Sequence, residues 1–168
     1  CCSYLFTYIL VTFPTNYLMN YTYKIKVKDN EIVTVLANDG TKHFVAPVTK
    51  RGNKIYLVGK NGLINYIGIT KQSMSSRIRY GVKPNHKTGY HGYKWLKENG
   101  DHSLIVWIFN DNVDVEAIEA EIVHFFRVQH DQWPKYQTEI HFHTTTSEQR
   151  SLAKIILKES EKIVRNIT

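Results

Sequence analysis

The sequence contains very little cysteine. Its two cysteines, Cys1 and Cys2, are adjacent at the start of the chain, so they cannot form a disulfide framework or a cysteine-based zinc site. An intracellular, cytoplasmic protein is therefore expected. Long hydrophobic runs are also absent: the apolar segment 4–13 is too short to span a bilayer and lacks a basic stretch before it. We expect no membrane anchor.

Acidic residues are in short supply as well. The 168 residues include 22 Lys and Arg but 15 Asp and Glu, a formal charge of +7, and the pI is near 9.3. This balance favours an acidic partner, of which nucleic acid is the commonest. A basic protein without such a partner is the alternative at this level.

The chain has no internal repeat, low-complexity tract or Ser/Gly linker that would mark a second independent domain. We interpret residues 1–18 as a non-native or disordered leader, because Met19 opens a segment typical of a protein start. Residues 19–53 are expected to form an N-terminal β extension and 54–146 the core. Residues 147–168 form a C-terminal helix packed on that core.

Alternating and β-rich segments predict the strands. Residues 21–48 are typical of a small β-meander, with a turn at 38–40 (Asn-Asp-Gly) before a last strand at 42–48. The pair Asn61-Gly62 favours a tight hairpin between two later strands. The predicted core strands are 54–58, 64–69 and 103–109. They predict an α/β or α+β fold with a small antiparallel three-stranded sheet flanked by helices.

Helical spacing and capping residues predict the helices. Ser73 is expected to cap a helix that ends at Gly81, and 93–99 a short helix. Asp114 starts the strongest helix, whose apolar face contains Val115, Ile118, Ile122, Phe125 and Phe126. The amphipathic helix 147–166 is expected to bury Leu152, Ile155, Ile156 and Ile163.

Two tripeptides on the paired strands form a recognisable motif. Lys54-Ile55-Tyr56 is followed, after nine residues, by Tyr66-Ile67-Gly68. This resembles the paired motif that names the GIY-YIG nuclease family, with Lys54 in place of the family's first glycine. Tyr and Ile are routine strand residues, so the downstream pattern has to carry the resemblance. The similarity extends over about residues 54–137.

The downstream residues support the resemblance. Arg77, in a predicted helix, is similar to the family's catalytic arginine, and Arg79 replaces it if the register slips. A glutamate helix followed by Pro134-Lys135-Tyr136 resembles the excision-repair incision nucleases. At 100° per residue, Glu119 lies nearer the centre of the apolar face than its competitor Glu121. We therefore choose Glu119 as the metal ligand.

The resemblance implies a division of labour in phosphodiester hydrolysis. Tyr56 is the general base, and Tyr66 binds the attacking water or the phosphate, although the two tyrosines can exchange roles. Arg77 binds the phosphate through two hydrogen bonds and offsets transition-state charge. Glu119 holds Mg²⁺ (or Mn²⁺) alone, with waters and phosphate completing the coordination.

Three further positions bear on this assignment. His91 falls near the place of a family histidine, and His86 is less well placed. Repair-type members have a lysine where this chain has Ile69, and Gln137 replaces their late asparagine. The missing lysine weakens the resemblance to a repair enzyme, whereas Gln137 keeps the amide. A stand-alone endonuclease of restriction, homing or mobile-element type is expected, because the sequence lacks the extra domains of the repair incision enzymes.

The stretch 71–97 is rich in Lys, Arg and aromatic residues and has no Asp or Glu. It predicts a phosphate-contacting surface for DNA, expected to be double-stranded. The alternative is a solvated basic loop. The expected nucleic-acid-binding residues are Lys71, Arg79, Lys83, Lys87 and Lys94.

Two rival functions compete with the nuclease. Glu121 with the histidines at 124, 130, 141 and 143 suggests zinc, because His141 and His143 alternate on one predicted strand face. No standard zinc spacing is met, so surface histidines are favoured. The other rival is a non-catalytic nucleic-acid-binding module with a degenerate GIY-YIG fold, which the loss of glycine at Lys54 makes worth keeping.

Overall fold

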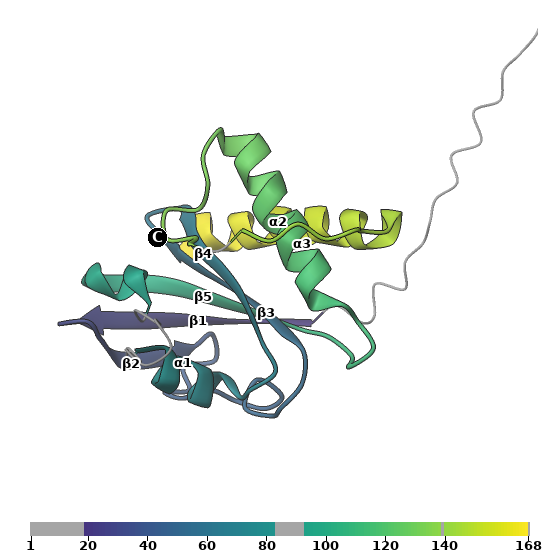
Figure 1. The fold of residues 1–168 in the computed structure, drawn as a ribbon. Coiled ribbons are helices and arrows are strands. Elements are labelled where there is room, and N and C mark those ends of the chain that lie inside the picture. The colour runs from purple at the N-terminus through teal and green to yellow at the C-terminus, as the bar shows by residue number, and fades with distance from the viewer. Residues whose placement is uncertain (1–18, 83–92, 139, 168) are drawn as a thin grey trace, which may run out of the picture.

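One antiparallel sheet of five strands organises the fold (Figure 1). A computed structural model describes residues 19–82, 93–138 and 140–167. The strand order is β2-β1-β5-β3-β4, and all neighbouring strands are antiparallel. The strands are β1 (Met19–Lys28), β2 (Glu31–Ala37), β3 (Lys54–Lys60), β4 (Leu63–Thr70) and β5 (Gly100–Ile108). The helices are α1 (Met74–Val82), the 3-10 turn η3 (Lys94–Lys97), α2 (Val115–His130) and α3 (Ser147–Ile167). The α+β class is confirmed.

The prediction of a three-stranded sheet is wrong, because the N-terminal hairpin joins the core strands. β1 pairs with β5 along its length, from Met19 opposite Ile108 to Val27 opposite Gly100. The alternation in β1 buries one side of the strand, including Tyr23 and Ile25. Pairing with β5 places that side on the same core as the residues of β3.

The predicted strand at 42–48 is also wrong. The turn before it does form: the Ala37 amide donates to the Thr41 carbonyl at 2.8 Å. The segment that follows contains turns and bends and no strand, and Pro47 has no amide proton to give to a ladder. Phe44 and Val48 are buried against the sheet instead. The segment therefore covers part of the core without extending the sheet, and β2 remains the edge strand.

The local signals for turns and caps are confirmed. Asn61 and Gly62 have φ values of 53° and 77° and form the two-residue hairpin between β3 and β4. The Ser73 hydroxyl accepts a 3.1 Å bond from the amide three residues on. The Asp114 carboxylate does the same at 3.2 Å for α2. The short helix expected at 93–99 is only the single turn η3.

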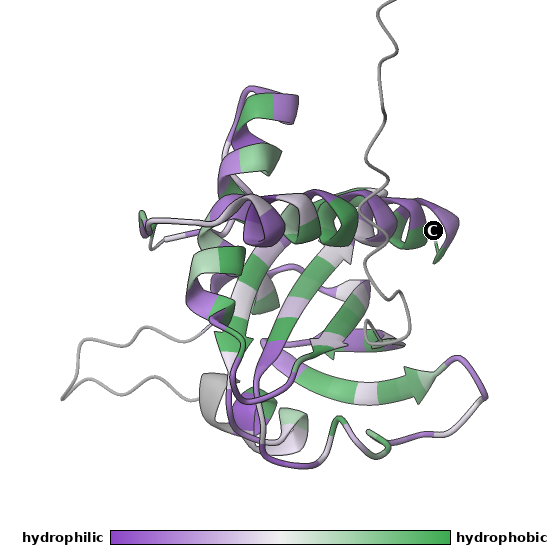
Figure 2. Cartoon of the chain, turned by 90° about the vertical axis from the view of Figure 1, so that its right-hand side faces the viewer, coloured by the Kyte–Doolittle hydropathy of each residue, from purple (hydrophilic) through white to green (hydrophobic). Residues whose placement is uncertain are grey.

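The two faces of the sheet have separate cores. Figure 2 shows largely hydrophobic strands between helices with hydrophilic outer faces. On one face α1 and η3, which contributes Trp95, cover Tyr23, Ile25, Tyr56, Val58 and Leu104. On the other, α2 and α3 cover Ile55, Leu57, Ile67, Ile105 and Trp107. No helix within the described ranges is long and apolar enough to cross a membrane.

The buried stripes of the long helices differ slightly from those predicted. Ile155 is 45% exposed, while Ile156 is buried together with Ala153, Leu157 and Val164. In α2, Val123 is buried and Phe125 is only partly buried. The periodicity is correct, but the apolar face of each helix is turned by about one residue.

Candidate functional site

The two motif tyrosines and the predicted arginine come together on the α1 face of the sheet. The Nε of Arg77, on α1, donates to the Tyr56 hydroxyl on β3 at 3.2 Å. The rings of Tyr56 and Tyr66 lie 5.9 Å apart, tilted by 44°. The guanidinium carbon of Arg77 lies 6.0 Å from the centre of the Tyr56 ring. Three elements thus bring three sequence-predicted side chains into one cluster.

Gly68 makes this close approach sterically possible. It pairs with Tyr56 across the two strands. A Cβ atom at Gly68 would lie 2.9 Å from the Tyr56 hydroxyl oxygen and 2.9 Å from Cε1 of Tyr66. Only glycine leaves room for both rings here, so the glycine of the second tripeptide acts as a spacer.

Lys54, at the position of the family's first glycine, is a buried structural cation. Its ammonium donates to the carbonyls of Lys50, Gly52 and Gln72 at 2.7, 3.0 and 3.1 Å. Burial lowers the pKa of Lys54. Because the three carbonyls satisfy all three of its protons, Lys54 ties the loop before β3 to the residues leading into α1.

Burial favours the neutral form of Tyr56. Its side chain is 0% exposed, and burial raises its pKa further above the usual value. Tyr93 adds to that rise and Arg77 opposes it. Burial disfavours the charge on Arg77, but Tyr56 and Tyr93 outweigh this effect and raise the pKa of the guanidinium. Arg77 is therefore a permanent cation beside two tyrosine oxygens.

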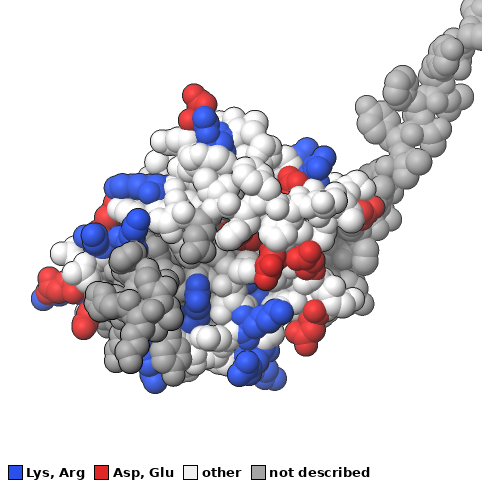
Figure 3. All heavy atoms as spheres, in the orientation of Figure 1, with Lys and Arg blue, Asp and Glu red and all other residues white. Residues whose placement is uncertain are grey.

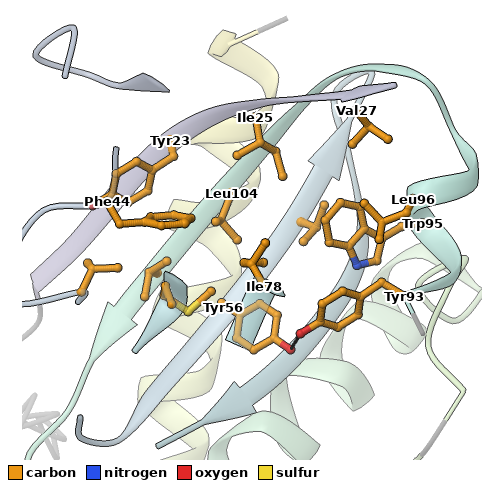
Figure 4. Packing of buried hydrophobic residues seen from close by; sticks show 14 of the residues in the cluster. Tyr23, Ile25, Val27, Phe44, Tyr56, Ile78, Tyr93, Trp95, Leu96 and Leu104 are labelled. Atoms are coloured by element: carbon orange, nitrogen blue, oxygen red, sulfur yellow. Dashed lines mark hydrogen bonds between the residues drawn. The ribbon is translucent and has the colours of Figure 1, made fainter. Parts of the chain in front are cut away.

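Tyr93 belongs to the cluster, although the sequence singles it out only as an aromatic in a basic stretch. Its hydroxyl lies 3.0 Å from that of Tyr56, as the dashed line in Figure 4 shows. No local pattern marks this contact, since it joins residues 37 positions apart. His91, Lys83 and Lys87, which were also expected in this region, lie outside the described residues, as does His86.

Glu119 lies on α2 beside the strand that carries Tyr66. It is 8% exposed, and its Oε1 accepts a 3.2 Å bond from Nε2 of Gln137. The other end of the same amide, Oε1 of Gln137, accepts from the Ile67 amide at 3.2 Å. Gln137 therefore links the predicted metal ligand to the residue that follows Tyr66.

Glu121 has different surroundings. Its carboxylate accepts from the Thr145 hydroxyl at 2.5 Å and lies 3.5 Å from Nε of Arg150 on α3. Glu119 therefore lies next to β4, whereas Glu121, two residues further along α2, pairs with the start of α3.

The zinc alternative does not assemble. Within the part of the chain that the structure describes, no group of three His, Cys, Asp or Glu side chains could hold a metal ion. His130 lies 2.6 Å from a carboxylate oxygen of Glu161 instead. The rings of His141 and His143 are 6.4 Å apart. These histidines do not converge on a common point.

The segment 134–137 (Pro-Lys-Tyr-Gln) contacts both the residue after η3 and the strand β4. The Glu98 carboxylate, just after η3, accepts hydrogen bonds from the Lys135 ammonium and the Tyr136 hydroxyl, and Lys60 lies 3.6 Å away. These donors lower the pKa of Glu98 to about 2. The Tyr136 amide also donates to the Asn65 carbonyl of β4 at 2.9 Å. The segment is thereby fixed along the edge of β4.

Exposed cations surround the entry to α1. Lys71, Arg79 and Lys94 are all exposed, and Figure 3 shows Lys and Arg side chains over the lower part of the visible face, where α1 lies. The loop residues Lys50 and Arg51, which sequence reasoning did not select, are exposed too. The amide of Gly52, the next residue, donates a 3.0 Å hydrogen bond to the Lys71 carbonyl and so joins the two loops.

Comparison with known proteins gives little beyond this geometry. The chain matches no protein-family profile and no curated protein. It is similar to a solved structure described as restriction endonuclease HPY188I in complex with product DNA, with 12% identity over 74% of this chain and 82% of that chain, and a TM-score of 0.38. A likeness this distant carries no argument, so the function of this chain has to be argued from its own residues.

Proposed function

We propose that the chain is a metal-dependent endonuclease of GIY-YIG type, which hydrolyses phosphodiester bonds in double-stranded DNA. One observation carries the proposal: Arg77 donates to Tyr56 at 3.2 Å with Tyr66 packed 5.9 Å from the Tyr56 ring. An obligate cation among tyrosine hydroxyls suits a site that binds a phosphate and removes a proton from water.

The tyrosines and the arginine divide the chemistry. Tyr56, as the phenolate, takes the proton from water; the water oxygen attacks phosphorus, and the bond from phosphorus to the leaving oxygen breaks. Tyr66 orients the water or the phosphate. Because burial raises the pKa of Tyr56, the less buried Tyr66 is the alternative base. Arg77 supplies its terminal NH₂ groups to the phosphate oxygens.

Glu119 is the residue that would hold the metal. A buried carboxylate is the oxygen donor that Mg²⁺ or Mn²⁺ prefers, and Gln137 orients it through the 3.2 Å bond. Water and substrate would have to supply the other ligands, since no group of three protein ligands occurs among residues 19–82, 93–138 and 140–167. The ion would neutralise charge on the phosphate and the leaving oxygen.

Exposed cations on the α1 side would receive the DNA backbone. Lys71 follows β4 directly, Arg79 lies on α1, and Lys94 opens η3 next to Tyr93. Lys83, Lys87 and His91 stay predictions from the sequence. Such contacts position the duplex without reading its sequence.

Cleavage assays with matched variants test the proposal. Plasmid and oligonucleotide duplexes are incubated with the protein in Mg²⁺ or EDTA. Arg77→Ala and Glu119→Gln should each lower the cleavage rate by roughly 10²–10³-fold, the usual cost of losing one transition-state contact. Arg79→Ala should weaken DNA binding without changing the rate at saturation. Glu121→Gln should leave metal dependence intact. Metal-independent cutting, or cutting insensitive to Arg77→Ala, would contradict the mechanism.

One observation favours a second candidate, a non-catalytic nucleic-acid-binding module. The Tyr56 hydroxyl is enclosed, with a raised pKa, as expected of a tyrosine that only supports the fold. This candidate predicts salt-dependent DNA binding in EDTA and no cleavage of any substrate in Mg²⁺ or Mn²⁺. The same assay therefore separates the two functions.

A further inference from the structure

Tyr93 contacts each of the other three members of the cluster. Its hydroxyl lies 3.0 Å from that of Tyr56 (Figure 4). Its ring meets the Tyr66 ring edge-on, with centroids 5.7 Å apart, and the Arg77 guanidinium carbon lies 5.7 Å from its centre. Tyr93 is 6% exposed, so these contacts are largely shielded from water.

The Tyr93 ring packs against a buried tryptophan. It stacks on Trp95 with centroids 5.3 Å apart and an interplanar angle of 28°. Trp95 itself is 0% exposed and belongs to the core of the α1 face. A phenol ring fixed on both faces and edge presents its hydroxyl in one place. The position of the Tyr56 hydroxyl is thus defined by two partners, Arg77 and Tyr93.

Hydrogen-bond chemistry assigns a direction to the contact between the two tyrosines. Arg77 can only donate, so the 3.2 Å bond makes the Tyr56 oxygen an acceptor. While Tyr56 is neutral, either hydroxyl can donate across the 3.0 Å contact. Once Tyr56 has lost its proton it can only accept, and Tyr93 must then be the donor. The ionised Tyr56 receives two donors, one of them Tyr93.

We infer that Tyr93 is a positioning residue for the cleavage reaction, whose hydroxyl holds the Tyr56 oxygen in place beside Arg77. The inference rests on the proposed nuclease function and on Tyr56 as the base. In this arrangement Tyr93 touches neither water nor phosphate and acts through Tyr56. Its ring contributes to packing, whereas its hydroxyl contributes to the reaction.

Tyr93→Phe separates these two contributions, because it keeps the ring and removes only the hydroxyl. We expect the single-turnover rate at saturating DNA to fall roughly 10- to 100-fold, the usual range for losing one hydrogen bond to a charged group. The dissociation constant for DNA in EDTA should stay within about twofold, since phosphate contacts are untouched. Tyr23→Phe is the matched control: it removes the buried hydroxyl that accepts from the Val45 amide at 3.3 Å. It should leave the rate unchanged.

A double-mutant cycle tests whether Tyr93 acts through Tyr56. If it does, Tyr93→Phe should cause no further loss in a Tyr56→Phe background, because the acceptor of its bond is gone. Losses that multiply would overturn the inference. So would a Tyr93→Phe rate within twofold of wild type, or a rate loss that Tyr23→Phe reproduces. A wild-type protein that binds DNA but never cleaves it removes the proposed function itself, and Tyr93's role with it.

Discussion

The two faces of the sheet differ in the side chains that they bury. On the α2/α3 face the strands contribute aliphatic side chains such as Ile55 and Leu57, which pack under two long helices of 16 and 21 residues. On the α1 face the intervening residue Tyr56 points into a cluster of tyrosines with Arg77. The helix there has only nine residues. Strand alternation thus places an aliphatic core residue and a candidate catalytic residue next to each other in the sequence, on opposite faces of the sheet.

This difference teaches where stability and activity are separable. The α2/α3 face buries mainly aliphatic side chains, with few polar groups such as Trp107 and Ser160, which hydrogen-bond to each other, so its loss should appear as unfolding. On the α1 face, hydroxyls are held at hydrogen-bond distance, so small displacements should appear as lost activity before lost stability.

The largest effect on stability is expected on the α2/α3 face. Ile118 is 0% exposed in α2, and Ile118→Ala should lower the unfolding free energy by about 2–5 kcal/mol through lost burial and a cavity. Urea denaturation measures this change. Ile155→Ala, at a side chain 45% exposed, should stay within about 0.5 kcal/mol. If Ile118→Ala instead slowed cleavage by folded protein at unchanged stability, stability and activity would not depend on different faces of the sheet.

A pair of glycines on neighbouring strands tests the comparison directly. Gly68→Ala places a methyl group 2.9 Å from atoms of Tyr56 and Tyr66. It should cost about 1–3 kcal/mol by overpacking, and cleavage should fall by more than about tenfold as the tyrosines move. Gly59→Ala places its methyl group 2.6 Å from both methyls of Val164 on α3. It should cost similar stability but leave the cleavage rate of folded protein unchanged.

The contacts of the Glu98 carboxylate with Lys135, Tyr136 and Lys60 predict a contribution to stability that is lost in acid. The pKa of Glu98, lowered from 4.5 to about 2 by Lys135, Tyr136 and Lys60, means that folding favours the ionised form. The contribution is complete above the unfolded pKa and is lost as pH falls through about 4 toward 2. Allowing for screening at this partly exposed group, we expect about 1–2 kcal/mol. Urea titrations at pH 6, 4 and 3 measure it, and Glu98→Gln should flatten this part of the profile.

Local features of the fold could be predicted from the sequence because their causes are local. The Asn61-Gly62 hairpin and the caps at Ser73 and Asp114 each depend on a few adjacent residues. The pairing of β1 with β5 depends on partners about eighty positions apart, such as Tyr23 and Leu104. No periodicity within either segment identifies the other, so the sequence predicts the N-terminal hairpin as a separate extension.

The candidate site follows the same rule. Its family-like members, Tyr56, Tyr66 and Arg77, could be selected because their spacing is visible in the sequence. The burial of Glu119 follows from counting 100° per residue along α2, although its role as metal ligand stays a prediction. Tyr93 could not be found this way. Its contact with Tyr56 arises only when the segment before η3 folds over β3.

The smallest effect concerns the charges around α1. Lys71 is exposed directly after β4, and Lys71→Gln should reduce the slope of log affinity against log salt by about 0.9, the value for one lost phosphate contact. Filter binding in EDTA over a salt series measures the slope, and the cleavage rate at saturating DNA should not change. Lys158→Gln removes another exposed lysine, on α3, and should leave the slope as it is. Equal losses from both variants would mean that the DNA responds to the overall charge of +7 and that the α1 face is not its docking surface.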